Sequence, residues 1–94
     1  MKKITLFYLE NCPYCRNAKQ ALAELIKEAP QYGQVEIHWV EESKEPDLAG
    51  QYDYYYVPTV FMGGAKLYEA SPMEPYAACK ANLKAALDTA LAEA

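Results

Sequence analysis

Two stretches of the chain carry the apolar patterns of β-strands. Residues 3–9 are rich in apolar and aromatic side chains, which predicts a buried strand. Residues 35–40 alternate between apolar and polar positions, so Val35, Ile37 and Trp39 are predicted to share one face of a second strand. Both segments are short enough to belong to one small sheet.

A third and a fourth strand are predicted around a pair of glycines. Residues 59–62 and 65–69 are apolar or mixed and flank Gly63-Gly64. Two strands separated by two glycines are typical of a β-hairpin, because glycine adopts the positive φ angles of a tight turn without a steric penalty. This hairpin would add antiparallel strands to the sheet.

Helical spacing begins at Pro13, which suits a first helical position because proline's missing N–H is not needed there. Pro30 and Gly33 are predicted to end this helix. Its apolar positions recur three or four residues apart, at Ala18, Ala21, Leu22, Leu25 and Ile26.

Two later segments are also predicted to be helical. Residues 41–55 are polar with a few aromatics, which fits a short helix or helical loop. Ser71-Pro72-Met73-Glu74 resembles a capping box with proline at the first helical position, and predicts a helix that reaches about Leu91. The buried candidates in that helix are Tyr76, Leu83, Ala86, Leu87 and Leu91.

The predicted order is therefore strand, helix, strand, helix, strand, strand, helix. The first strand–helix–strand unit implies a parallel pair with a right-handed crossover, and the hairpin adds antiparallel strands. Together they predict an α/β fold with a mixed sheet and packed helices, built as a single domain over residues 1–94.

Composition narrows the classes of function. The net charge of −4 argues against nucleic acid as a partner, because phosphate binding needs a basic surface. No apolar run approaches the roughly 20 residues that span a bilayer. Glu10 and Asn11 interrupt the apolar start before any signal-peptide cleavage site. We therefore expect a cytoplasmic protein without a membrane partner.

The chain has three cysteines, Cys12, Cys15 and Cys79. An odd number without a secretion signal is unlike a disulfide-stapled extracellular scaffold. A structural zinc site usually needs four Cys or His ligands, and His38 is the only histidine. We therefore expect neither a metal site nor a tightly bound cofactor.

The pair Cys12-Pro13-Tyr14-Cys15 follows a predicted strand and opens a predicted helix. Free N–H groups and the helix dipole at a helix N-terminus stabilise a thiolate, which is the reactive form of cysteine. A spacing of three residues brings the second sulfur close to the first. Cys12 is thus the predicted nucleophile, and Cys15 is predicted to resolve the mixed disulfide that Cys12 forms.

The segment Cys12-Pro13-Tyr14-Cys15, followed by Ala18-Lys19 and Leu22, resembles the active-site helix of dithiol glutaredoxins, which have the thioredoxin fold. Val57-Pro58-Thr59 is a second match. The resemblance implies a four-stranded mixed sheet with helices on both faces and a cis-proline at Pro58. It also implies that Pro13, Tyr14, Val57 and Pro58 line a substrate groove, in which the backbone of Val57 pairs with substrate.

Three departures from the glutaredoxin pattern affect its glutathione site. An acid, Glu10, stands where the family usually has a basic residue. Tyr56 replaces the usual threonine before Val-Pro, and Gly63-Gly64 lies too early to open the last helix. Ser71 and Glu74 could take over the role of the missing acidic segment. These departures predict weak binding of glutathione.

Other residues allow two interpretations. Tyr14 could contact substrate or be an exposed aromatic without a role, and Cys79 is expected to be a small packing residue. His38 is expected at the surface, and Lys19 is a solvated charge or a weak influence on the thiols. The tyrosines Tyr52, Tyr54, Tyr55 and Tyr56 fit either a contact surface or a core-and-turn role.

The leading hypothesis is a monomeric thiol–disulfide oxidoreductase in cell redox homeostasis, which reduces protein disulfides or glutathione mixed disulfides through Cys12 and Cys15. Its electron donor would be glutathione as a co-substrate or a reductase of the thioredoxin-reductase type. One alternative is a thioredoxin-like electron-transport carrier reduced by a flavoprotein. Another is a binding module in which the Cys12 thiolates of two chains bridge an iron–sulfur cluster.

Overall fold

A computed structural model describes residues 3–93 and contains a four-stranded sheet in the order β2-β1-β3-β4. Strand β1 (Lys3–Tyr8) is parallel to β2 (Glu36–Glu41) and antiparallel to β3 (Thr59–Met62). Strand β4 (Ala65–Glu69) pairs antiparallel with β3 and completes the hairpin. The sheet is therefore mixed, as the sequence predicts.

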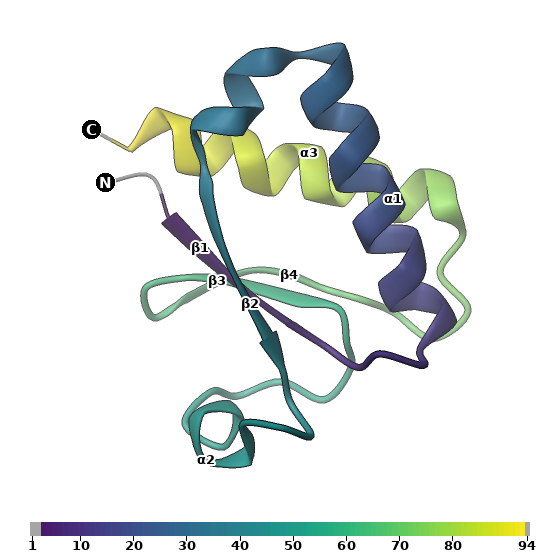
Figure 1. The fold of residues 1–94 in the computed structure, drawn as a ribbon, viewed down its shortest axis with the longest axis vertical. Helices are drawn as coiled ribbons and strands as arrows, with labels where there is room; N and C mark the ends of the chain where they lie inside the picture. Colours follow the sequence, from purple (N-terminus) through teal and green to yellow (C-terminus); the bar gives the residue numbers. More distant parts are fainter. Residues whose placement is uncertain (1–2, 94) are drawn as a thin grey trace.

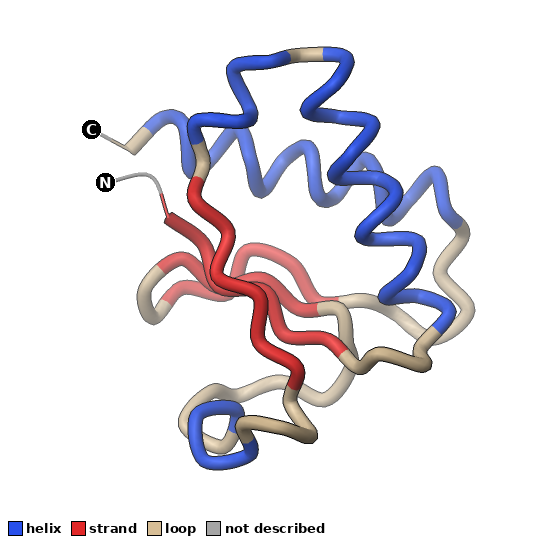
Figure 2. Tube along the Cα trace, in the orientation of Figure 1, coloured by secondary structure: helices blue, strands red, loops and turns tan. Residues whose placement is uncertain are grey.

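Helices cover both faces of this sheet (Figures 1 and 2). Helices α1 (Pro13–Glu28) and α3 (Tyr76–Ala92) pack against each other on one face, and a 3₁₀ helix, η1 (Pro30–Gln34), connects α1 to β2. The short helix α2 (Pro46–Ala49) lies on the opposite face. Within residues 3–93, no helix combines the length and the apolar character needed to cross a membrane.

The alternation of side chains along β1 supplies two hydrophobic cores. Ile4 and Leu6 point toward α1 and α3, where they pack with Leu22, Leu83 and Leu87. Phe7 points the other way and forms a second core with Val40 and Phe61 under α2 and the following loop. The buried β1 is thus held from both faces, which fixes the position of its C-terminal end.

The hairpin prediction is confirmed, since β3 and β4 meet at Gly63-Gly64 and Gly63 has a φ angle of 60°. The residues predicted to share one face of β2 become more exposed toward the C-terminal end of the strand. Val35 is buried and Ile37 is half-buried, but Trp39 is 37% exposed because β2 is an edge strand. Trp39 instead packs edge-on against Tyr8, with ring centroids 5.8 Å apart.

The predicted capping box is wrong. Ser71 to Glu74 forms a turn in which Met73 has a φ angle of 62°, and α3 begins only at Tyr76. The cause is Pro75, because a proline disfavours helical backbone angles at the residue before it. The Glu74 carboxylate instead accepts hydrogen bonds from the Tyr68 hydroxyl and the side chain of Asn82.

Candidate active site at the Cys12–Cys15 pair

The two sequence motifs meet at one edge of the sheet. This edge holds the C-terminal ends of β1, β2 and β4 and the start of β3. Because Phe7 is the partner of Thr59, the preceding segment Val57–Pro58 reaches the edge where the loop from β1 leads to Cys12. The Val57–Pro58 peptide bond is cis, as the resemblance implies.

Cys12 lies at the N-cap of α1, with Pro13 as the first helical residue. The Cys12 carbonyl accepts hydrogen bonds from the N–H groups of Cys15 and Arg16, both at 3.1 Å. No side chain caps this helix end. The Cys12 thiol is partly exposed, so a substrate sulfur can reach it from solvent.

Cys15 occupies a different environment one turn further along. Its side chain is buried, at 2% exposure, and the backbone N–H of Leu9 donates a hydrogen bond to its Sγ at 3.4 Å. Burial raises the pKa of the Cys15 thiol to about 12, and the neighbouring Cys12 thiol and the charge of Glu42 act in the same direction. Cys15 therefore holds its proton at neutral pH.

The residues predicted to line the substrate groove differ in how exposed they are. Pro13 is exposed, and Tyr14 is half-buried. Pro58 is buried, whereas Val57 is half-buried and packs against the core of Phe7. The role of these four residues in binding substrate stays a prediction.

Glu69 holds the loop that precedes Pro58. Its carboxylate accepts hydrogen bonds from the N–H groups of Tyr55 (2.6 Å) and Tyr56 (2.8 Å), and Lys66 pairs with the same carboxylate at 2.8 Å. The Thr59 hydroxyl also donates to the Tyr56 carbonyl at 2.7 Å. Sequence reasoning missed Glu69. The hairpin register, which sets Glu69 opposite Thr59, is the signal that could have found it.

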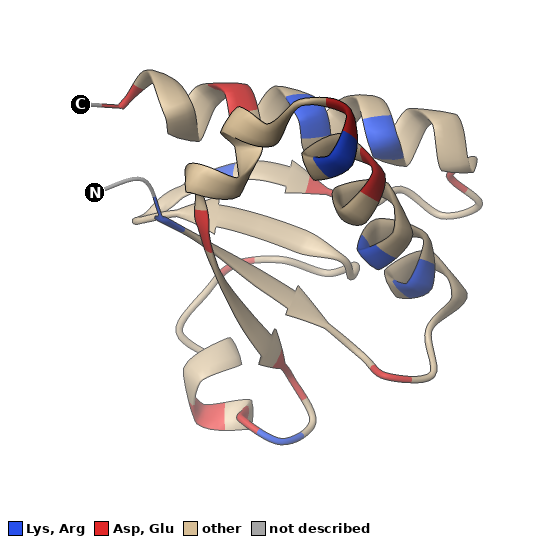
Figure 3. Ribbon diagram, turned by 45° about the horizontal axis from the view of Figure 1, so that its top comes forward, with Lys and Arg blue, Asp and Glu red and all other residues tan. Residues whose placement is uncertain are grey.

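A pocket of about 330 Å³ adjoins Cys12, and carboxylates also line it. Its lining residues are Leu9, Glu10, Asn11, Cys12, Glu41 and Ser43. Figure 3 shows acidic positions in the β1–α1 loop, at the end of β2 and at α2, with one basic position between β2 and α2. Acidic residues therefore outnumber basic ones on this side of the candidate site.

Glu41 is the buried acid of this pocket, and sequence reasoning also missed it. Its carboxylate accepts hydrogen bonds from the N–H and hydroxyl groups of Ser43 and from the N–H of Glu10. These hydrogen bonds, those from Ser43 above all, lower the pKa of the Glu41 carboxyl group. The carboxylate thus keeps its charge and ties the end of β2 to the loop before Cys12.

Glu10 has a nearby cation that the sequence did not reveal. Lys44 Nζ lies 3.2 Å from a Glu10 carboxylate oxygen, although the two residues are 34 positions apart. Both side chains are more than half exposed, so the pair is weak and screened by salt. Lys44 therefore partly neutralises the negative charge of Glu10, the acid that stands where the glutaredoxin family usually has a basic residue.

The remaining candidates separate into surface and core. His38 is exposed, while Cys79 is buried beside the Tyr68 hydroxyl and burial raises the pKa of its thiol. Of the tyrosine cluster, Tyr52 and Tyr54 pack against Phe7 at centroid distances of 4.8 and 5.0 Å. Its other two members, Tyr55 and Tyr56, are exposed.

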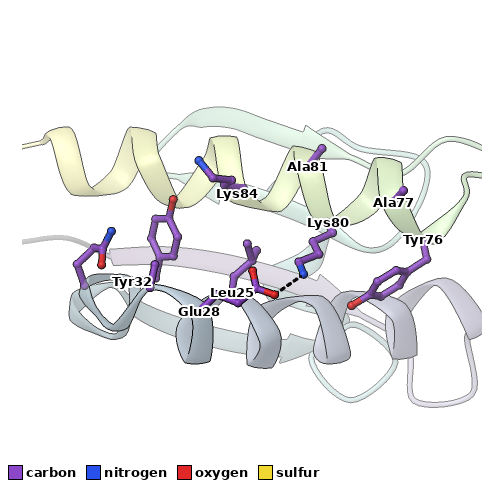
Figure 4. Close-up of a pocket in the computed structure, with 10 residues that line it drawn as sticks. Leu25, Glu28, Tyr32, Tyr76, Ala77, Lys80, Ala81 and Lys84 are labelled. Atoms are coloured by element: carbon purple, nitrogen blue, oxygen red, sulfur yellow. Dashed lines mark hydrogen bonds and ion pairs between the residues drawn. The ribbon is translucent and has the colours of Figure 1, made fainter.

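A larger cavity, of about 620 Å³, lies between α1 and α3 (Figure 4). Tyr32, Tyr76 and Leu25 line it, and Lys80 pairs with Glu28 at 2.8 Å across it. Neither Cys12 nor Cys15 borders this cavity. Cys12 instead lines the smaller pocket at the sheet edge.

Comparison with known proteins connects this chain to a family. The chain is 31% identical over 70 residues to a protein named thioredoxin from Methanocaldococcus jannaschii, and the match covers 74% of this chain and 80% of that protein. A solved structure described as that of a malarial protein matches with a TM-score of 0.58 and 17% identity, over 87% of this chain and 92% of that one. That second likeness concerns the fold alone. No protein-family model matches the chain.

Proposed function

Since the chain belongs to the thioredoxin family, we propose that it is a thiol–disulfide oxidoreductase that reduces protein disulfides through Cys12 and Cys15. The observation that carries the proposal is the unequal exposure of the two thiols. Cys12 is reachable at the start of α1, whereas Cys15 is buried directly behind it. Such a pair suits one attacking and one resolving sulfur.

In the first step, the Cys12 thiolate attacks one sulfur of the substrate disulfide. The substrate S–S bond breaks, a new S–S bond joins Cys12 to the substrate, and the other substrate sulfur leaves as a thiolate that takes up a proton. The free N–H groups at the start of α1 stabilise the attacking thiolate. The backbone beside Pro58 holds the substrate segment by strand-like pairing.

In the second step, Cys15 loses its proton and attacks the Cys12 sulfur of the mixed disulfide. The Cys12–Cys15 disulfide forms, and the second substrate sulfur leaves and takes up a proton. The raised pKa of Cys15 keeps this thiol protonated at neutral pH, which leaves the first attack to Cys12. In sum, the dithiol gives two electrons and two protons to the substrate.

The proposed electron donor is a flavoprotein reductase of the thioredoxin-reductase type. The relative's name supports this choice, and so do the carboxylates of Glu10 and Glu41 beside Cys12. Glutathione carries two carboxylates of its own, and like charges facing each other disfavour binding. Glutathione is therefore proposed as the poorer electron donor. Separately, we propose that the protein acts in the cytoplasm.

Reduction of a protein disulfide by the intact chain tests the proposal. Insulin reduction with dithiothreitol as the electron source should proceed with wild type and fall to background in Cys12→Ser. Cys79→Ser is the matched control, because it removes a thiol that is equally free but buried in the core. Full activity of Cys12→Ser would refute the proposal.

A further inference from the structure

A second pocket at the active-site edge is lined by three tyrosines and a carboxylate. It has a volume of about 370 Å³ and lies between α2 and the loop that leads to Pro58. Tyr52, Tyr54, Tyr55 and Glu42 provide its aromatic and charged lining, and no lysine or arginine among residues 3–93 borders it. Tyr52 and Tyr54 also pack in the core of Phe7, whereas the two-step reduction gives no role to Glu42 or Tyr55.

The lining of this pocket suits a cation. Aromatic faces attract ammonium and guanidinium groups through the ring quadrupole. Glu42 adds a formal negative charge, and one of its oxygens accepts a hydrogen bond from the Tyr54 hydroxyl at 2.8 Å. The packing of Tyr52 and Tyr54 on Phe7 holds two of the three rings in place before any ligand arrives.

The third ring, Tyr55, has no structural role that would explain its position. Its side chain is 85% exposed, so it contributes little to the core. Its backbone is nevertheless fixed, because the Glu69 carboxylate accepts the N–H bonds of Tyr55 and Tyr56. An exposed aromatic on an anchored backbone is typical of a contact residue, since little conformational entropy is lost on binding.

The pocket lies within reach of a substrate held at Cys12. Tyr55 precedes Val57 by two residues, a step of about 7 Å along an extended chain. Glu42 directly follows Glu41, which lines the pocket of Cys12. The N–H of Glu42 donates a hydrogen bond to the Tyr8 carbonyl at 3.0 Å. Residues flanking a substrate cysteine can therefore contact both pockets at once.

We propose that the pocket formed by Glu42, Tyr52, Tyr54 and Tyr55 binds the lysine or arginine side chain of a protein substrate, close to the disulfide that Cys12 attacks. The inference rests on the proposed function and names its substrate class as protein disulfides with a basic neighbour. The carboxylates at Glu10 and Glu41 act in the same direction, because they disfavour acidic partners.

Matched peptide substrates test this proposal. Each peptide contains the same intramolecular disulfide and carries either lysine or its neutral counterpart norleucine, at one of the positions two to four residues from a cysteine. At one or more of these positions, wild type should reduce the lysine peptide with a kcat/KM about threefold to tenfold higher than that for the norleucine peptide. A partly exposed cation–π contact and ion pair allow a difference of this size. The difference should arise mainly from a lower KM for the lysine peptide. The preference should shrink at high salt.

Two variants remove the pocket chemistry, and one controls for charge. Glu42→Gln and Tyr55→Leu should each lower the ratio of lysine to norleucine rates, and the double variant should bring it close to one. Glu45→Gln changes the net charge by the same amount at an exposed site outside the pocket, and it should keep the preference. The norleucine peptide corrects for any effect of Glu42 on Cys15 itself.

A binding measurement separates this inference from the proposed function. A lysine peptide with serine in place of both cysteines should shift the NMR signals of Tyr52 and Tyr55, and the shift should be lost in Glu42→Gln. Equal reduction of both peptides at every position, or a preference lost equally in Glu45→Gln, would overturn the cation pocket. Failure to reduce any of the peptides would instead overturn the proposed reductase.

Discussion

The backbone N–H of Leu9 donates a hydrogen bond to the Sγ of Cys15 at 3.4 Å. This contact joins the residue that follows β1 to the buried sulfur one turn into α1. It fixes Cys15 behind Cys12 and leaves Cys12 as the thiol that solvent reaches. The separate roles proposed for the two sulfurs follow from this arrangement, and each role can be tested alone.

Cys15→Ser should stop the second step and preserve the first. Cys12 can still attack a protein disulfide, but no second thiol is left to release the product. Incubation with a protein disulfide should therefore accumulate a mixed disulfide that runs as a larger species on a non-reducing gel and contains Cys12. A complex that maps to Cys79 instead would contradict the assignment of roles.

Alkylation should distinguish the two active-site thiols by pH. Because burial raises the pKa of Cys15 to about 12, its thiolate is scarce at neutral pH and becomes abundant only as the pH rises toward that value. Limited iodoacetamide at pH 7 should label Cys12 and leave Cys15 unmodified, as judged by peptide mass spectrometry. Preferential labelling of Cys15 at pH 7 would show that its burial is not maintained in solution.

Cys79→Ala should leave disulfide reduction unchanged. Cys79 is 2% exposed in the core, where its thiol lies beside the Tyr68 hydroxyl. Loss of this small side chain should lower the free energy of unfolding by about 1 kcal/mol, measured by denaturant titration. A loss of turnover as large as that of Cys12→Ser would give Cys79 a redox role.

Glu10→Lys should strengthen the interaction with glutathione. The substitution removes a carboxylate beside Cys12 and also frees Lys44 from its ion pair. The Michaelis constant for a glutathione mixed disulfide should fall by about 1.5- to 5-fold at low salt, the range of one exposed charge interaction, and the gain should shrink at high salt. Glu45→Lys, at an exposed site, serves as the control because it changes the net charge by the same amount. If wild type already had a low Michaelis constant for the glutathione mixed disulfide, and Glu10→Lys did not change it, the residues that bind glutathione would lie elsewhere in the chain.

Glu69→Ala should weaken substrate binding by releasing the backbone of Tyr55 and Tyr56. The Michaelis constant for a protein disulfide should rise several-fold, while the rate of Cys12 alkylation by a small reagent stays unchanged. Lys66→Met is the matched control, because it removes the ion pair and keeps both backbone hydrogen bonds. Equal effects of the two substitutions would assign the role to charge rather than to the anchored loop.

Local sequence patterns predicted most of the helices and strands, because the spacing of apolar residues and the positions of turn residues encode them. Pro13 marks the first residue of α1, and Gly63-Gly64 marks the hairpin turn. The helix α3 and its end near Leu91 were predicted, but its start was wrong: α3 begins at Tyr76, because Pro75 disfavours helical backbone angles at Glu74. The resemblance to dithiol glutaredoxins stays a prediction, whereas membership of the thioredoxin family is shown.

Contacts between distant residues set the limit on predicting the site. Lys44 meets Glu10 across 34 positions, and Glu69 reaches Tyr55 across 14 positions. Both contacts depend on how strand ends align at one edge of the sheet, which no local period encodes. The adjacent cysteines Cys12 and Cys15 were predictable because three-residue spacing on a helix already brings their side chains together.

The disulfide state of the reduced chain during one turnover tests the central claim most directly. Reduced wild type is mixed with an equivalent of insulin, quenched with acid at intervals, alkylated and mapped by mass spectrometry without reduction. The mechanism predicts that a Cys12–Cys15 disulfide appears in step with each insulin disulfide that is lost, and that Cys79 stays a free thiol throughout. Loss of insulin disulfides without formation of the Cys12–Cys15 disulfide would contradict it.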